Sequence, residues 1–255
     1  MVDFPENSYR SLWFLSPHET SVLVARINRD RGDVKLLPFS WRELLTYFGD
    51  LKIVGFACMF FCQNVVSTAL SYFLPLILQG GLGFSTDQAI LLAVPPYYYA
   101  IIPVILSSFI GDRFRLRGPI IVFNCLCLLA GMGMLGFAES SVVRYVGTYL
   151  ATGAYVSNWA AISAFWSNNV TSQWKRAFTA AVVTAFNGAG GIAGSFIFKQ
   201  NEAPRYSTAI WVSVGSQILL IAFVVAFWVF FGYMNRLQKR SARIIEGTVG
   251  FRYTF

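Results

Sequence analysis

Charged residues are scarce in this sequence. Asp, Glu, Lys and Arg make up 13% of its 255 residues, whereas soluble domains carry roughly 25%. None of these residues, and no histidine, falls in the middle of the long apolar stretches. This absence excludes proton-relay carboxylates and catalytic histidines from the interior of those stretches. Because hydrophobic residues reach 56%, against about 45–50% in average chains, the composition predicts a membrane protein.

Cysteine and histidine are also rare, which limits metal and redox chemistry. The single histidine, His18, falls in the first turn of a capped helix, and we interpret it as a surface residue. Ser195 follows a glycine, but no histidine lies near it in the sequence to act as a base. The cysteines lie inside apolar runs, where we interpret them as small core residues. We therefore expect no metal, no cofactor and no enzyme activity. The four cysteines are Cys58, Cys62, Cys125 and Cys127.

Six apolar stretches are long enough to cross a bilayer, because a spanning helix needs roughly 20 mostly apolar residues. Short connections that contain glycine, proline or charged residues separate them. The sequence therefore predicts an all-α membrane protein with a six-helix transmembrane bundle over residues 51–234. The predicted spans lie at about 51–78, 87–110, 119–138, 142–167, 177–198 and 208–233.

Lys and Arg are distributed unevenly between the two sides of this topology. Seventeen of the 20 fall in residues 1–52, in the second and fourth connections and in the C-terminal tail. Because basic residues mark the cytoplasmic side of a membrane protein, we expect both termini to be cytoplasmic. The basic residues form short segments rather than one patch, so we expect no nucleic-acid partner.

The segments outside the spans are predicted to be cytoplasmic. Residues 1–50 form a helical lead-in, with capping boxes at Ser16–Glu19 and Ser40–Glu43. The helix that follows the second box has an apolar stripe, which we expect to lie on the membrane surface. Residues 235–255 form a basic tail.

Uncharged polar and aromatic residues occur inside several predicted spans. They either bind one another between helices, which stabilises by about 0.6–2 kcal/mol per contact, or line a polar cavity. Both interpretations stay open, although the clusters in the first and fourth spans favour a cavity wall. The candidate substrate-binding residues are Gln63, Asn64, Tyr72, Tyr98, Tyr155, Asn158, Trp159 and Asn187.

Prolines interrupt the second predicted span. Pro95 and Pro96 have no N–H, so a continuous helix would leave the carbonyls of Leu91 and Leu92 without their helical partners. Discontinuous spans occur at transporter binding sites, but a simple kink for packing is the alternative. The following tyrosines point in different directions on a helix, so only one or two of them could contact a ligand.

The fifth predicted span contains a small-residue motif. Gly190 and Gly194 are four residues apart, the GxxxG spacing that lets two helices approach closely. This pattern predicts helix packing and implies no chemistry.

The connection between the second and third spans carries four charges within six residues. It reads GDRFRLRG and resembles the cytoplasmic loop motif of the major facilitator superfamily. Asp112, Arg113 and Arg117 match that motif. The sequence departs from it at Ser108, Arg115 and Leu116, where the family commonly has Gly, Gly and a basic residue. The resemblance implies that the loop is a cytoplasmic gate whose charge pairs break as the carrier opens, while arginines that only fix the topology are the alternative.

A wider resemblance covers essentially the whole chain. Segments such as VPPY, RGPIIVFN, NNVTSQWKRA and IIEGTVGFRYTF are similar to the C-terminal half of fungal anion:cation symporters, which include allantoate, nicotinate and pantothenate permeases. The resemblance implies half of a major-facilitator fold, with spans seven to twelve present and spans one to six absent. It further implies that the first and fourth spans face a central cavity. The second and fifth would meet the other half, which would leave the GxxxG face without a partner.

The expected function is transmembrane transport. By resemblance, the chain is a plasma-membrane carrier that takes up a small organic anion or vitamin-like carboxylate together with protons. Its expected partners are the lipid bilayer and either the missing N-terminal half or a second copy of the chain. Two alternatives stay open: a half-carrier fragment without transport activity, and a six-span membrane interaction protein. We expect the chain alone not to transport, since its cavity-facing polar residues would then meet lipid or self-associate.

Overall fold

The structure, a computed structural model, describes residues 16–31, 40–82, 85–197, 199, 202, 206–241, 246 and 251–255. The chain divides into two units, Met1–Ser40 and Trp41–Phe255. In the first unit, helix α1 spans Pro17–Arg31. Its predicted capping box is present, because the Glu19 backbone N–H donates to the Ser16 hydroxyl and the Ser16 backbone N–H donates to the Glu19 carboxylate. These bonds satisfy N–H groups that have no partner within the helix.

The second unit is a bundle of helices, and each predicted span coincides with one of them or with a pair. The second span is divided into α4 and α5, as its prolines predicted. The helices of this unit are α2 (Trp41–Tyr47), α3 (Leu51–Leu82), α4 (Thr86–Ala93), α5 (Pro95–Phe114), α6 (Arg117–Phe137), α7 (Ser141–Asn169), α8 (Gln173–Phe196) and α9 (Ser207–Ser241).

Five segments of the described chain are long and apolar enough to cross a membrane: Leu51–Tyr72, Thr86–Phe114, Arg117–Phe137, Gln173–Phe196 and Ser207–Arg240. The remaining predicted span, 142–167, corresponds to α7, which has 29 residues but a more polar composition. The fold explains this difference, because α7 contacts α3, α5 and α6 and buries Thr148, Thr152 and Asn158 among them. Its polar groups therefore face other helices.

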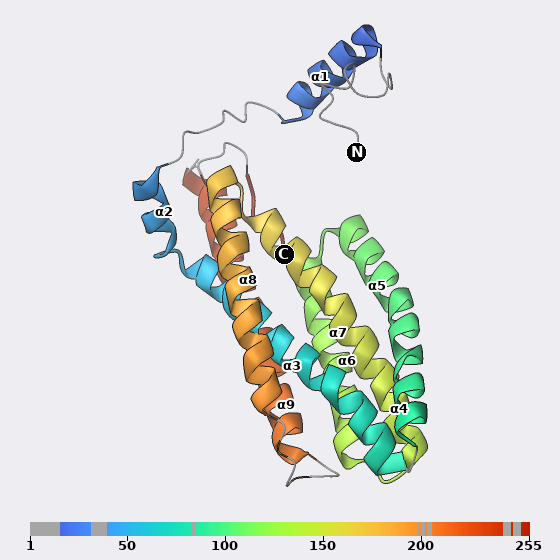
Figure 1. Ribbon diagram of the computed structural model, residues 1–255. Helices are drawn as coiled ribbons and strands as arrows, with labels where there is room; N and C mark the ends of the chain where they lie inside the picture. The colour runs from blue at the N-terminus through green and yellow to red at the C-terminus, as the bar shows by residue number, and fades with distance from the viewer. Residues whose placement is uncertain are drawn as a thin grey trace. The chain divides into compact units, whose positions relative to one another are not determined.

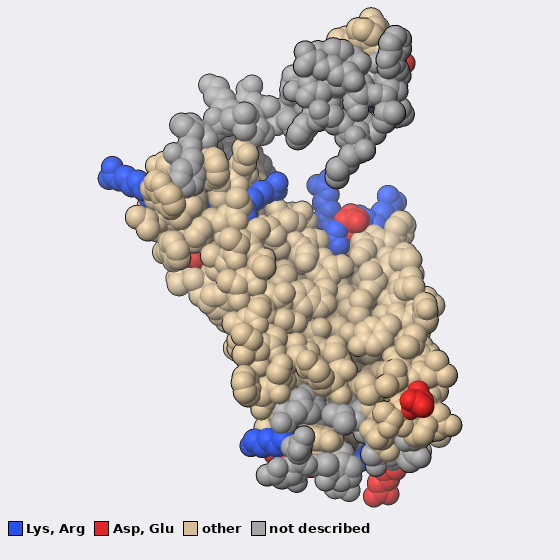
Figure 2. Space-filling view, in the orientation of Figure 1, with Lys and Arg blue, Asp and Glu red and all other residues tan. Residues whose placement is uncertain are grey.

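The helices of the second unit form two layers (Figure 1). Across one layer the packed neighbours follow the order α8, α3, α7, α5, while α6 and α9 pack behind α3 and α7. We call the end at which α3, α6 and α8 begin the charged end of the bundle. Figure 2 shows Lys and Arg side chains gathered there, above a broad face that is almost entirely free of charged side chains.

Aromatic rings fill the core near the charged end. Phe56 of α3 stacks on Phe227 of α9 with ring centroids 4.6 Å apart, and it meets Phe165 of α7 edge-on at 5.8 Å. All three rings are buried. Such pairs contribute about 0.5–1.5 kcal/mol each beyond the burial of their area, so this cluster joins three helices.

The GxxxG motif packs within the chain. A Cβ atom built on Gly190 would lie 2.5 Å from the carbonyl oxygen of Phe61, and one built on Gly194 would lie 2.8 Å from that of Val65. Both glycines therefore let α8 touch the backbone of α3. The expectation that this face lacks a partner is wrong, because α3 covers it.

Two segments outside the predicted spans lie with the helices of the second unit. Helix α2 belongs to the bundle, since Phe48, which follows it, meets Phe178 of α8 edge-on at 4.7 Å. Trp41 and Leu45 are exposed, and their predicted position on the membrane surface stays a prediction. Residues 251–255 are also part of the bundle, and their contacts are described below.

Candidate functional site

Two of the predicted substrate-binding residues lie inside the bundle instead of facing a cavity. Gln63 of α3 donates to the Tyr155 carbonyl over 2.8 Å, and Asn158 of α7 donates to the Gln63 side chain over 3.1 Å. Asn158 also approaches the Cys125 sulfur of α6 at 3.4 Å. Gln63 and Asn158 are fully buried. They bind one another because a buried amide without a hydrogen-bond partner is costly, and in doing so they join three helices.

A second pair lies at the junction of α3 and α8. Asn64 donates its side-chain N–H to the backbone carbonyl of Asn187 over 2.7 Å. Both residues are partly exposed, but the Asn187 side-chain oxygen is buried and has no hydrogen-bond partner among the residues that the structure describes. This pair therefore leaves a buried, unpaired amide oxygen at the seam between the two helices.

Aromatic residues flank these amides on α3, α5 and α7. Tyr155 is buried and meets Tyr97 of α5 edge-on at 6.5 Å. Trp159, partly exposed, meets Phe60 of α3 at 5.4 Å. Tyr98 is 70% exposed. We call the outward surface of α3 and α7 between α8 and α5 the wall.

Three of the predicted residues, Asn64, Asn187 and Trp159, are partly exposed beside or on this wall. Tyr72, on α3, is 58% exposed. Three others are buried between the helices: Gln63, Tyr155 and Asn158. The last of the set, Tyr98, is exposed on α5. The structure therefore brings part of the predicted set together at one surface, buries a second part between helices and leaves two tyrosines exposed, and the substrate-binding role of the set stays a prediction.

The break between α4 and α5 has its own hydrogen bonds. The helix stops at Val94, whose N–H donates to the Leu91 carbonyl over 3.3 Å. Pro96 has no N–H to donate to the Leu92 carbonyl. This carbonyl instead accepts a hydrogen bond from the Tyr145 hydroxyl of α7 over 3.2 Å. A tyrosine from another helix thus replaces a missing backbone donor, a role that the sequence did not reveal.

The α5–α6 turn carries the loop motif. Asp112, with its side chain 73% exposed, forms an ion pair with the nearly buried Arg117. Arg113 is exposed. Arg115 adopts a left-handed backbone with φ 54°, the conformation that glycine adopts most easily. The pairing lies within the turn itself, and the gate role of Asp112, Arg113 and Arg117 stays a prediction.

A cluster of charged side chains that the sequence did not predict lies at the charged end of the bundle. Lys175 of α8 lies 2.6 Å from the Asp50 carboxylate and 2.8 Å from that of Glu246. Lys52 also pairs with Glu246, and the Tyr253 hydroxyl donates to the same carboxylate over 2.9 Å. The side chains of the charged residues are at most 20% exposed. A cluster of this kind joins the start of α3, the start of α8 and the C-terminal residues.

The surroundings shift the acidities of two groups in this cluster. Burial acts to raise the pKa of Asp50, but the hydrogen bond from Lys175 and the nearby charge of Lys52 outweigh it and hold that pKa below its ordinary value. Burial raises the pKa of Tyr253, and the negative charge of Asp50 adds to this effect. Asp50 is therefore ionised and Tyr253 neutral near pH 7.

Residues 251–255, which we call the C-terminal strap, are held by paired amide contacts. Tyr253 donates its N–H to Asn235 over 3.0 Å and accepts from the same side chain over 2.9 Å. Thr254 makes the equivalent pair with Asn169, at 2.8 Å and 3.2 Å. Both asparagines thereby bind the strap as a neighbouring β-strand would. No pattern in the sequence pointed to this arrangement.

The family of the chain follows from comparison with known proteins. Residues 11–197 match the Major Facilitator Superfamily. The chain belongs to this superfamily. The family predicted from the loop motif is thus confirmed, as is the all-α membrane fold. No solved structure matches the chain.

The curated relatives of this superfamily member are fungal transporters. An uncharacterized transporter of Schizosaccharomyces pombe is 29% identical over 238 residues, which cover 92% of this chain and 47% of the relative. The high-affinity nicotinic acid transporter of Saccharomyces cerevisiae is 29% identical over 237 residues, 91% of this chain and 43% of the relative. The MFS transporter prlL of a fungal species is 27% identical over 262 residues, which cover 99% of this chain and 51% of the relative. The chain spans about half the length of these relatives.

Proposed function

We propose that this chain forms one half of a carrier that takes up a small organic anion or vitamin-like carboxylate together with protons. The wall is the observation that supports this proposal, because it places amides and aromatic rings on a bundle surface that carries no charge at mid-membrane. The name of the yeast relative supports a carboxylate, since nicotinic acid is one. The resemblance to fungal anion:cation symporters points the same way.

The chemistry of the wall suits part of such a substrate. Amide N–H groups donate to a carboxylate, and ring edges of Tyr97 and Trp159 suit a planar apolar body. An anion in the membrane interior also needs a compensating cation, and no Lys, Arg or His lies in the middle of the apolar stretches. In this proposal the cation and the proton site come from the other half of the carrier.

The charged end is proposed to face the cytoplasm of a plasma-membrane protein. A reporter fused to the C-terminus is then expected to become accessible only after the membrane is permeabilised. The glycosylation sequon that begins at Asn169 is expected to stay unmodified, and the structure adds a reason, because this asparagine is fully buried against the strap. External accessibility of the reporter in intact cells would contradict the orientation.

A chimaera tests the transport function. The chain replaces the second half of the Saccharomyces cerevisiae nicotinic acid transporter in cells that lack the intact protein. Labelled nicotinate, pantothenate and allantoate are offered in parallel assays. We expect uptake of at least one of them, and we expect a protonophore to abolish that uptake. A chimaera that reaches the membrane at normal abundance yet takes up none of these carboxylates would contradict the proposal.

A variant pair tests the role of the wall in the same chimaera. Asn187→Ala removes the side-chain amide, whose N–H group is a donor for a carboxylate, but keeps the backbone carbonyl that Asn64 binds, so we expect a higher KM with normal abundance. Ser195→Ala is the matched control, because Ser195 is exposed on the same helix and its hydroxyl donates to the carbonyl of Gly191, one turn earlier. Equal KM values for the two variants would remove Asn187 from the substrate site.

A further inference from the structure

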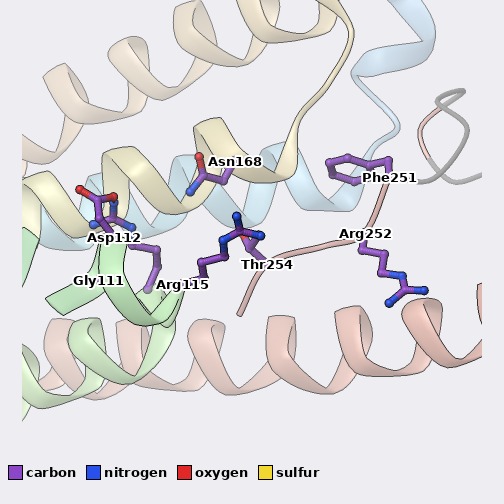
Figure 3. A pocket seen from close by; sticks show the side chains of 8 residues that line it. Gly111, Asp112, Arg115, Asn168, Phe251, Arg252 and Thr254 are labelled. Atoms are coloured by element: carbon purple, nitrogen blue, oxygen red, sulfur yellow. The ribbon is translucent and has the colours of Figure 1, made fainter. Parts of the chain in front are cut away.

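A cavity of about 340 Å³ opens at the charged end between the α5–α6 turn, the end of α7 and the C-terminal strap. Figure 3 shows Arg115 extending from the turn toward Thr254 of the strap, with Asn168 of α7 beside them. Arg252 leaves the strap further along its length. The lining residues are Gly111, Asp112, Arg115, Arg117, Asn168, Phe251, Arg252 and Thr254.

The charges that line this cavity do not cancel. Arg117 pairs with Asp112 and is nearly buried, so that pair is close to neutral. Arg115 and Arg252 are exposed, and neither forms an ion pair with a residue that the structure describes. The guanidinium group of Arg115 therefore lies at this cavity without a carboxylate partner, and Arg252 contributes a second one that Figure 3 shows directed away from Arg115.

The backbone at Arg115 supports a role for its side chain. A left-handed conformation is unfavourable at a non-glycine residue, whereas glycine adopts this φ of 54° without strain. The turn is also fixed to the strap, because the Arg117 backbone N–H donates to a terminal main-chain oxygen of Phe255 over 2.6 Å. Arg115 is thus held in an unfavourable conformation beside the strap, and such conformations cluster at functional sites.

We propose that this cavity binds a phosphate group. Guanidinium groups bind phosphate oxygens through paired charge-assisted hydrogen bonds, which assigns Arg115 as the first cationic ligand. Arg252, an exposed side chain of the same lining, is the second and turns toward Arg115 when the phosphate binds. The side-chain amide of Asn168 supplies a neutral donor. The cavity lies where the spans Thr86–Phe114 and Arg117–Phe137 meet, the depth at which lipid headgroups lie, and basic pockets between spans bind such headgroups. The phosphate comes from an anionic phospholipid or from a soluble phosphate, and in either case it bridges the turn and the strap.

Calorimetric titration of the full 255-residue chain in an uncharged detergent tests this proposal. The probes are inorganic phosphate and a short-chain phosphatidic acid, with a short-chain phosphatidylcholine as the zwitterionic comparison. The key variant is Arg115→Gly, which removes the guanidinium while relieving the backbone, so it is expected to fold. Arg252→Gln tests the second cation. Arg113→Gln is the matched control, because Arg113 is exposed in the same turn but does not line the cavity.

We expect saturable binding of at least one phosphate probe, tighter for phosphatidic acid than for phosphatidylcholine. Arg115→Gly and Arg252→Gln are each expected to weaken it by about tenfold, the loss that follows from removing a charge-assisted hydrogen bond, and Arg113→Gln by less than about twofold. Binding of the lipid alone assigns the site to headgroups, binding of phosphate alone assigns it to soluble phosphate, and binding of both probes assigns it to either source. No saturable binding, or equal weakening by Arg115→Gly and Arg113→Gln, would overturn the proposal.

Discussion

The substitution Gly190→Leu is expected to prevent stable packing of α8 on α3, whereas Gly188→Leu in the same helix is expected to be tolerated. A Cβ atom at Gly190 would lie 2.5 Å from the Phe61 carbonyl oxygen and 3.1 Å from its Cα atom. Both are backbone atoms, so no side-chain rotation relieves the clash and the helices must separate. Overpacking of this kind costs about 3 kcal/mol, and the neighbouring contact at Gly194 is lost with it.

Gly188 provides a control at the same helical depth. A Cβ atom there meets nothing within 4 Å. The measurement is the thermal unfolding midpoint and the monodisperse yield of each variant in detergent. We expect a large loss of both for Gly190→Leu and little change for Gly188→Leu. Similar behaviour of the two variants would show that α8 does not pack on α3 through this motif.

The sequence predicted the helices well, because apolar length and helix-breaking residues are local signals. Pro95 and Pro96 located the division between α4 and α5, and the Ser16 box located the start of α1. The GxxxG spacing correctly indicated a close helix approach. Its partner was missed, since nothing local in the sequence says which neighbouring helix a small-residue face will meet.

The polar residues show where sequence reasoning stops. The sequence alone could not decide whether Gln63 and Asn158 line a cavity or bind one another, because both outcomes satisfy a buried amide. The charge cluster was not predicted either, since Lys52 and Glu246 lie far apart in the sequence and each resembles an ordinary surface charge. The strap depends on Asn169 and Asn235, two residues whose pairing requires the folded bundle.

The second prediction with a large effect concerns transport by the 255-residue chain alone. In carriers of this type the substrate lies between two repeats, and one repeat moves against the other. The bundle supplies one wall, and α5 leaves large apolar side chains such as Ile105 and Phe109 exposed. A single bundle has no second wall to enclose the substrate. A second copy of the chain could provide one, and this is the arrangement that would restore transport.

Uptake by purified protein in liposomes tests the central claim that this chain is one half of a carrier. The vesicles carry a proton gradient, and labelled nicotinate, pantothenate and allantoate are offered in turn, with the transporting chimaera as the positive control. We predict no accumulation above that of empty vesicles for the 255-residue chain. Gradient-dependent accumulation by this chain would contradict the account and make a functional homodimer the leading description.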